Sequence, residues 1–107
     1  MDALQSLYQT VQFRKEAGES GSYTCYLLER GLDKVLKKCG EECSEVLIAA
    51  KNGNNAETVM ELSDLLYHLT VLMVSQGISY EEVQAELAKR SQKQRNLKAF
   101  HEVDKNT

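Results

Sequence analysis

The sequence contains no proline, and none of its apolar runs approaches the roughly 20 residues that a helix needs to cross a membrane. No alternation of apolar and polar residues is long enough to predict a β-strand. The N-terminus also lacks the apolar stretch of a secretory signal. These absences indicate an all-α protein with no membrane-spanning segment, and we expect it in the cytoplasm.

Cysteine is scarce as well. The three cysteines, Cys25, Cys39 and Cys43, form an odd number, and a zinc site would need more thiolate or imidazole ligands at suitable spacing. We interpret them as small apolar core residues. The formal net charge is −3 and no basic patch contains aromatic residues, so binding to nucleic acid is disfavoured.

The length of 107 residues suits one domain covering residues 1–107, without internal repeats. Caps and apolar periodicity predict about four to five helices. The expected ranges are 3–17, 24–30, 32–51, a helix from the turn at 52–55 to residue 76, and a last helix after Ser79. The polar residues 91–107 are expected to fray. One helix is apolar on most sides, so we expect a helical bundle completed by oligomerisation, as a homodimer or higher homo-oligomer.

Two pairs of acidic residues lie at helical spacing inside strongly apolar segments: Glu42 with Glu45, and Glu61 with Asp64. Residues at this spacing project from one face of a helix, so each pair can offer two carboxylates to one point. Two unit charges about 5 Å apart repel by roughly 3 kcal/mol at an effective dielectric constant of about 20. If the two helices face each other, the acids therefore require a metal ion, protonation, or a site open to water.

The helix after residue 55 carries a single polar column on an otherwise apolar surface. The column consists of Glu57, Glu61, Asp64, His68 and Ser75. We interpret this helix as central and largely buried. Ionised carboxylates are rarely buried unless they are paired or metal-bound, so a polar column on a buried helix is unusual. The alternative is that the column faces solvent while the rest of the helix packs.

The preceding helix has an apolar stripe that predicts its core-facing side. The stripe consists of Leu32, Leu36, Cys39, Cys43, Val46 and Ala50. Glu42 and Glu45 lie on its shoulder, whereas Glu41 points about 100° away from Glu42. We therefore place Glu41 behind the ligand positions or beside a water. Without these three acids and the Glu61–Asp64 pair, the formal charge of −3 would become +2, so the acidity is local.

Several segments together resemble one enzyme family. They are Ser22-Tyr23-Thr24, Lys38-Cys39-Gly40-Glu41-Glu42 with Glu45, Ala49-Ala50-Lys51-Asn52-Gly53, and Ser63-Asp64-Leu65-Leu66-Tyr67-His68-Leu69. In these segments the sequence closely resembles phosphoribosyl-ATP pyrophosphohydrolase, within the all-α MazG-like nucleoside triphosphate pyrophosphohydrolases. That superfamily is marked by Glu-Glu-x-x-Glu followed by Glu-x-x-Asp, and this chain has both elements in order.

The resemblance implies hydrolysis of the α–β phosphoanhydride of phosphoribosyl-ATP to phosphoribosyl-AMP and pyrophosphate, the second step of histidine biosynthesis. It implies bound Mg²⁺, an ion that suits all-oxygen ligands. The candidate ligands are Glu42, Glu45, Glu61 and Asp64. Glu41 is the candidate for orienting or deprotonating the attacking water. Catalysis would then consist mainly of positioning and electrostatics.

Further residues are candidates for binding the nucleotide substrate: Ser22, Tyr23, Lys38, Lys51 and His68. Ser22 and Tyr23 can hold anions at a helix start, or act as a helix cap and a core-edge tyrosine. Lys38 can contact a phosphate or pair with neighbouring carboxylates. His68 can bind a carboxylate or the ligand, or be a satisfied core histidine. Lys51 can instead stabilise the end of its helix through the helix dipole.

Three other functions compete with this one. A house-cleaning hydrolase of noncanonical or deoxynucleoside triphosphates would use the same carboxylates. A di-iron oxidoreductase would need Glu-x-x-His motifs on paired helices, and no such motif occurs. A helical interaction module would explain the apolar faces but would leave the acids without a purpose.

Overall fold

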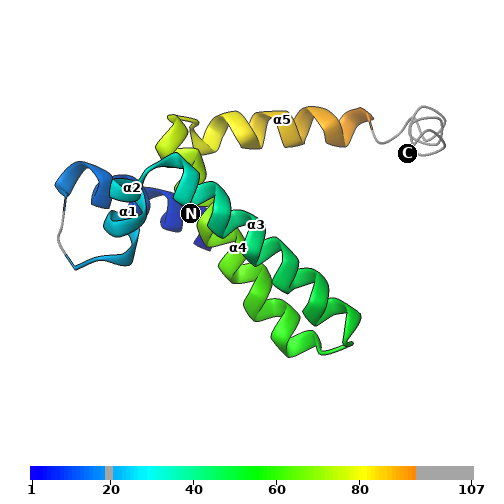
Figure 1. The fold of residues 1–107 in the computed structure, drawn as a ribbon. Coiled ribbons are helices and arrows are strands. Elements are labelled where there is room, and N and C mark those ends of the chain that lie inside the picture. The colour runs from blue at the N-terminus through cyan, green and yellow to red at the C-terminus, as the bar shows by residue number, and fades with distance from the viewer. Residues whose placement is uncertain (19–20, 94–107) are drawn as a thin grey trace.

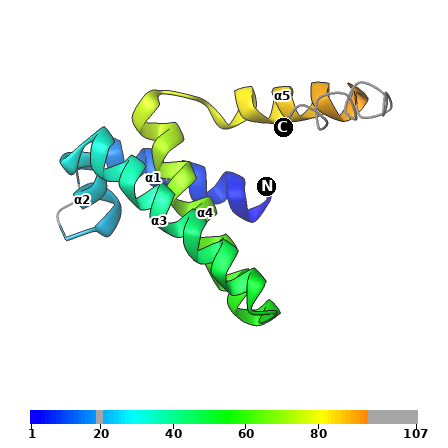
Figure 2. The ribbon, with the colours of Figure 1, turned by 45° about the vertical axis from the view of Figure 1, so that its right-hand side comes forward.

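The computed structural model describes residues 1–18 and 21–93, and all regular structure in these ranges is helical. The helices are α1 (Ala3–Ala17), α2 (Tyr23–Arg30), α3 (Leu32–Lys51), α4 (Asn55–Gln76) and α5 (Tyr80–Lys93). α3 and α4 form a long antiparallel hairpin, α1 and α2 pack around one end of it, and α5 projects away from that end (Figure 1, and turned in Figure 2). The all-α prediction is confirmed. No helix in the described ranges is long and apolar enough to span a bilayer.

The helix boundaries follow from caps that the sequence contains. At the start of α1, α2, α4 and α5, a side-chain oxygen accepts a hydrogen bond from a backbone N–H of the first turn. The pairs are Asp2 with Gln5 at 2.8 Å, Ser22 with Cys25 at 3.3 Å, Asn54 with Glu57 at 3.0 Å and Ser79 with Glu82 at 3.1 Å. α5 continues to Lys93, past the expected start of the polar tail. The rest of that tail, and residues 19–20 of the linker before α2, lie outside the described residues.

Asp2 also links the start of α1 to the start of α5. Its carboxylate oxygens accept hydrogen bonds from the Tyr80 hydroxyl at 3.0 and 3.3 Å. The Tyr8 hydroxyl donates to the Ile78 carbonyl at 2.8 Å, and the rings of Tyr8 and Tyr80 meet edge to face with centroids 6.4 Å apart. These contacts hold the α4–α5 turn against α1.

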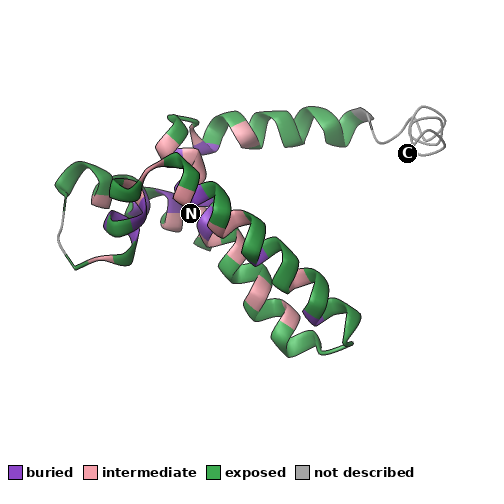
Figure 3. Cartoon of the chain, viewed as in Figure 1, coloured by how far each residue is buried: buried purple, intermediate pink, exposed green. Residues whose placement is uncertain are grey.

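The core lies where α1, α2 and the C-terminal half of α4 meet the first turns of α3 (Figure 3). Its buried members are Tyr8, Val11, Leu27, Val35, Val71, Val74 and Tyr80. Leu27, Val35 and Val71 have no exposed surface, so truncating any of them would leave a cavity. The outer half of the α3–α4 hairpin is mostly exposed (Figure 3), and the packed core therefore occupies only one end of the molecule.

The side of α3 that packs inward is not the side that its apolar stripe predicts. The buried residues of α3 are Val35, Glu42 and Ala49, which recur every seven residues. Of the predicted stripe, Leu32, Leu36, Cys43 and Ala50 are exposed, and Cys39 and Val46 are partly buried. The prediction is wrong for the single chain, as is the core assignment of Cys43, whereas Cys25 is buried. An apolar stripe predicts that a helix face is covered by other protein, but it does not predict whether the same chain or a second chain covers it.

The expectation that the helix after residue 55 is largely buried is wrong for the single chain. The buried residues of α4, which are His68, Thr70, Val71 and Val74, all lie in its C-terminal half. Nearer its N-terminus α4 lies beside α3 (Figure 1), and an exposed apolar series remains, which we call the α4 stripe: Val59, Leu62, Leu66 and Leu69. An equivalent series on α3, the α3 stripe, consists of Leu36, Cys43, Leu47 and Ala50. Both helices therefore present apolar surface that no described residue of the chain covers.

Candidate active site

The α3–α4 hairpin brings three of the predicted acids together. Glu42 and Glu45 of α3 and Glu61 of α4 each place a carboxylate oxygen within 4.8 Å of the other two. Glu42 is buried, Glu61 is partly buried and Glu45 is exposed. We call these residues the acidic cluster. It runs from the interior of the hairpin to its surface, so a ligand from solvent can reach it.

The spacing of residues on α3 explains this placement. Val35, Glu42 and Ala49 share the buried face of α3, so Glu42 points at α4 as the apolar residues on either side of it do. Glu45 follows one turn later and lies nearer the edge of that face. Glu61 comes from the facing side of α4, which runs antiparallel to α3 (Figure 2). The hairpin therefore converts two local sequence patterns into one cluster.

Two buried oxygens of the cluster are left without hydrogen-bond partners. Oε2 of Glu42 and Oε2 of Glu61 are inaccessible to solvent and accept no hydrogen bond from any described residue. Lys38 partly compensates, with Nζ 3.5 Å from Oε1 of Glu42 and 3.3 Å from Oε2 of Glu41. Burying an unpaired carboxylate oxygen is costly, and a hard divalent cation is the ligand that all-oxygen donors of this kind suit. The residues present therefore fit a metal ion.

The pKa of the Glu45 carboxyl reports the same crowding. A hydrogen bond with the Glu61 carboxyl and the Glu61 charge raise the pKa of Glu45 above its usual range, against opposing contributions from Glu42 and Lys38. Carboxyl groups this close favour keeping one proton between them when no cation is present. A bound cation would supply the positive charge in place of that proton.

Asp64 and Glu41 lie outside the acidic cluster. The Asp64 side chain is exposed, and its carboxylate is not among the three that converge within the described chain. Its backbone carbonyl accepts a 2.7 Å hydrogen bond from Nδ1 of His68. Glu41 is exposed and paired with Lys38. The assignment of Asp64 as a ligand and of Glu41 to the water therefore stays a prediction.

Tyr23 and His68 connect α2 to α4 beside the acidic cluster. The Tyr23 hydroxyl lies 3.2 Å from Nε2 of His68. Because the Asp64 carbonyl can only accept, Nδ1 of His68 carries its proton and Nε2 accepts from Tyr23. The hydroxyls of Thr24 and Tyr67 form a second short link between the same helices. His68 is thus a satisfied, buried histidine that also fixes the start of α2 next to the acids.

Thr24 and Tyr67 are not among the functional residues predicted from the sequence, although both lie in segments that carry the family resemblance. Their hydroxyls are 43 positions apart in the chain, so no local spacing pattern indicates that they meet. Ser22 caps α2, which is the simpler of the two roles considered for it. Lys38 forms ion pairs with neighbouring carboxylates, which is the second of the two roles predicted for it; the first is contact with a phosphate.

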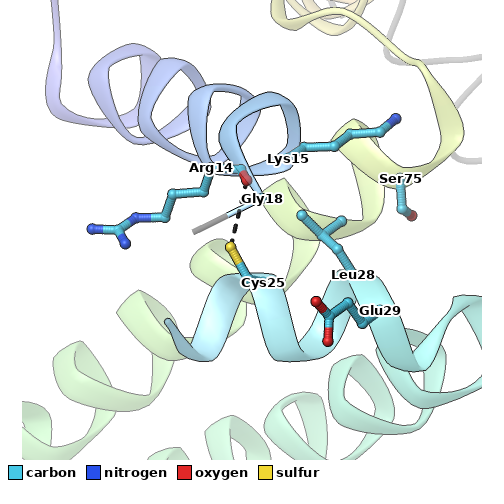
Figure 4. Close-up of a pocket in the computed structure, with 7 residues that line it drawn as sticks. All are labelled: Arg14, Lys15, Gly18, Cys25, Leu28, Glu29 and Ser75. Carbon is cyan, nitrogen blue, oxygen red and sulfur yellow. Dashed lines mark hydrogen bonds between the residues drawn. The ribbon is translucent and has the colours of Figure 1, made fainter. Parts of the chain in front are cut away.

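A separate cavity of about 290 Å³ lies between the C-terminal end of α1 and α2 (Figure 4). It is lined by Arg14, Lys15, Gly18, Cys25, Leu28, Glu29 and Ser75. The Cys25 thiol faces α1 and donates to the Arg14 carbonyl at 3.4 Å. No member of the acidic cluster lines this cavity, so it is not part of the candidate active site.

Comparison with known proteins agrees with this geometry. Residues 4–91 match the family described as phosphoribosyl-ATP pyrophosphohydrolase. A phosphoribosyl-ATP pyrophosphatase of Limosilactobacillus fermentum is 56% identical over 90 residues, covering 84% of this chain and 85% of the relative. A protein of the same name from Bacillus cytotoxicus is 50% identical over 101 residues, covering 94% of each chain. Another from Lactiplantibacillus plantarum is 46% identical over 103 residues, covering 96% of this chain and 97% of the relative.

The chain belongs to the phosphoribosyl-ATP pyrophosphohydrolase family.

The family match includes the whole of α2, α3 and α4, and with them the acidic cluster and the Tyr23–His68 link. It also includes Lys51, which is exposed in the last turn of α3. Lys51 lies about 9 Å along the helix axis from Glu45, at a rise of about 1.5 Å per residue. Its long side chain has to bridge most of that distance to touch a phosphate bound at the cluster, so a role in the pyrophosphohydrolase site stays a prediction.

Proposed function

We propose that this chain hydrolyses the α–β phosphoanhydride of phosphoribosyl-ATP, releasing phosphoribosyl-AMP and pyrophosphate in the second step of histidine biosynthesis. The family and the names of the relatives support the reaction. The structural observation that carries it is the acidic cluster, with two buried carboxylate oxygens that lack hydrogen-bond partners. A triphosphate is negatively charged and is repelled by carboxylates, so binding at this site requires a cation that contacts both the carboxylates and the phosphates.

Mg²⁺ is the cation that we propose. Glu42, Glu45 and Glu61 would hold it, and Asp64, one helical turn from Glu61, would join them after a side-chain rotation. When bound, Mg²⁺ would neutralise charge on the phosphate oxygens and acidify a bound water. The all-carboxylate donor set supports a hard ion and offers no thiolate that would favour a softer one.

The other residues of the site act through position and charge. Glu41 lies one residue from Glu42 on the exposed side and can accept a proton from the attacking water. Lys38 forms ion pairs with Glu41 and Glu42 and can form one with a phosphate oxygen when substrate binds. Ser22, Tyr23 and His68 order the start of α2 next to the phosphates, and Lys51 adds positive charge at the outer end of α3.

A homodimer or higher homo-oligomer is also part of this proposal. The α3 stripe and the α4 stripe support it, because exposed apolar series of this kind mark surfaces that another chain covers. The acidic cluster lies on the same two helices, so assembly would stiffen the site. Location in the cytoplasm, where nucleotide substrates of this kind are made and used, stays a prediction.

The decisive experiment measures pyrophosphate release from phosphoribosyl-ATP, ATP and a set of deoxynucleoside triphosphates in Mg²⁺. We expect kcat/KM for phosphoribosyl-ATP to exceed that for the others by at least about 100-fold, or roughly 2.7 kcal/mol. A substrate-specific site draws binding energy from the second ribose phosphate, and ATP lacks that group. Comparable or faster hydrolysis of a deoxynucleoside triphosphate would assign the chain to the house-cleaning hydrolases instead.

A further inference from the structure

A row of aromatic rings leads away from the acidic cluster along α2. The rings of Tyr67 and Tyr23 are stacked with centroids 6.2 Å apart and an angle of 24° between their planes. Tyr23 and Tyr26, one turn apart on α2, repeat the same spacing and angle. The Arg30 guanidinium carbon then lies 6.0 Å from the centre of the Tyr26 ring. The row therefore ends in a positive charge.

The inner end of the row touches the candidate active site. Tyr23 donates to His68, which is bonded to the Asp64 carbonyl. The pKa of the Tyr23 hydroxyl is raised, mainly by burial. His68 follows Glu61 of the acidic cluster by seven residues, about 10 Å along α4, so a ligand with its phosphates at the cluster has to span about that distance to reach the row.

The outer part of the row is open to solvent and borders a cavity. Tyr23 and Tyr26 are 47% and 43% exposed. Beside them is a cavity of about 460 Å³, within the usual size range of ligand sites. Its lining is Gly21, Ser22, Tyr23, Cys25, Tyr26 and Glu29.

We propose that the exposed rings of Tyr23 and Tyr26, with Arg30 at the end of the row, form the subsite for the purine ring and the second ribose phosphate of the substrate. This inference rests on the proposed function and names the residues that distinguish phosphoribosyl-ATP from ATP.

The chemistry of each group matches one part of that ligand. A purine presents a flat face, and stacking on an aromatic side chain recognises such a face in any base. A guanidinium offers paired N–H donors that match phosphate oxygens, and Arg30 is already held over the Tyr26 ring. Glu29, which lines the cavity beside Tyr23 and Tyr26, can accept hydrogen bonds from ribose hydroxyls. The phosphate is then placed by attraction to Arg30 and by repulsion from Glu29.

The first test compares Arg30→Gln with wild type on two substrates. We expect kcat/KM to fall at least about tenfold more for phosphoribosyl-ATP than for ATP, because only the former carries the second phosphate. The matched control is Arg90→Gln, which removes an exposed arginine of α5 that is paired with Glu86, and it should leave the ratio unchanged. Equal losses on both substrates, or no loss, would overturn the assignment of Arg30.

The second test concerns the rings and uses binding rather than turnover. Calorimetry with phosphoribosyl-AMP should show affinity at least about fivefold weaker for Tyr26→Leu, whereas Tyr26→Phe, which keeps the ring, should bind within about twofold of wild type. Melting temperatures of all variants confirm that they fold. Equal binding by Tyr26→Leu and wild type would overturn the stacking role.

The two levels of the proposal fail in different ways. A wild type that releases no pyrophosphate from phosphoribosyl-ATP contradicts the proposed function, and the subsite falls with it. A wild type that prefers phosphoribosyl-ATP, combined with an unchanged substrate ratio in Arg30→Gln, contradicts the subsite alone.

Discussion

Tyr23 and His68, 45 residues apart in the chain, are joined by a 3.2 Å hydrogen bond that links the start of α2 to the centre of α4. The hydrogen bond from Nδ1 of His68 to the Asp64 carbonyl fixes the histidine tautomer, so Nε2 accepts from the Tyr23 hydroxyl. Together with the Thr24–Tyr67 link, the bond from Tyr23 holds the aromatic row on α2 against α4. In the proposed function, the placement of the substrate relative to the cation should therefore depend on both contacts.

Replacing Tyr23 with phenylalanine should reveal that dependence. The change leaves Nε2 of the buried His68 without its donor, so the free energy of unfolding should fall by about 1 kcal/mol. The KM for phosphoribosyl-ATP should rise as α2 loses one of its two side-chain hydrogen bonds to α4. Urea unfolding at fixed protein concentration and steady-state kinetics measure the two effects.

Tyr26→Phe is the matched control for that stability measurement, because the Tyr26 hydroxyl makes no hydrogen bond within the described part of the chain. Its free energy of unfolding should stay within about 0.5 kcal/mol of wild type. Equal losses in the two variants would mean that the Tyr23–His68 bond contributes nothing specific.

Replacing Glu61 with glutamine should separate metal binding from folding. We expect kcat/KM in Mg²⁺ to fall by at least about 100-fold, because one anionic ligand of the shared cation is lost. Without metal the melting temperature should be unchanged or higher, because carboxylate repulsion is relieved. Pyrophosphate release and melting in a chelator provide the two readings.

Glu57→Gln is the control for that experiment. Glu57 lies one turn before Glu61 on the same polar column of α4 but is exposed and outside the acidic cluster. Its activity should stay within about threefold of wild type, under 1 kcal/mol of barrier. If Glu61→Gln also stayed within that range, the metal assignment would be wrong.

The pH dependence of stability should carry a contribution from Asp2. The backbone N–H of Gln5 and the Tyr80 hydroxyl lower the pKa of this carboxyl below its usual 3.8. The unfolded chain therefore takes up a proton at a higher pH than the folded chain, so the stabilisation is complete above pH 3.8 and is lost as the pH falls through the lowered pKa. Asp2→Asn keeps a capping side chain without titrating. The stability advantage of wild type over Asp2→Asn should shrink on acidification, and an advantage that grows would contradict this reading.

The apolar stripes predict self-association. Sedimentation of wild type at micromolar concentration should show a species larger than a monomer. Leu47 of the α3 stripe is 65% exposed in the single chain, and Val59 of the α4 stripe is 62% exposed. Leu47→Asp and Val59→Asp each place a charge in one of these stripes, and each should shift the protein toward monomer. Phe13→Asp, at a 63% exposed apolar residue of α1, should not. A wild type that is monomeric throughout the micromolar range excludes the proposed assembly.

Helix boundaries could be predicted from the sequence because their determinants are local. Asp2, Ser22 and Ser79 each act within one turn, and the structure places a cap at all three. The pairing of Glu42 with Glu45 is local for the same reason. Which face of α3 turns inward was not predictable, because both faces hold apolar residues and the choice depends on how the side chains of α4 pack against each face.

The meeting of the acids was predictable only in part. Convergence of Glu42, Glu45 and Glu61 follows from two helical spacings and one assumption, that the two helices face each other. Asp64 shares the polar column of Glu61 and the buried His68 but is exposed, and helical spacing does not specify the side-chain rotamer that decides this. The Thr24–Tyr67 link depends on the docking of α2, and hydroxyls 43 positions apart leave no local signal.

The bare outer faces of α3 and α4 have a consequence for how enzyme assays should be read. The acidic cluster lies on α3 and α4, whose outer halves receive little packing support from the rest of the described chain (Figure 3). If a second copy supplies that support, formation of a competent site is second order in enzyme. Initial velocity should then rise more steeply than linearly with enzyme at high dilution and become proportional to it only above the dissociation constant of the assembly. Specific activity measured at a single low enzyme concentration would understate what the folded site can do.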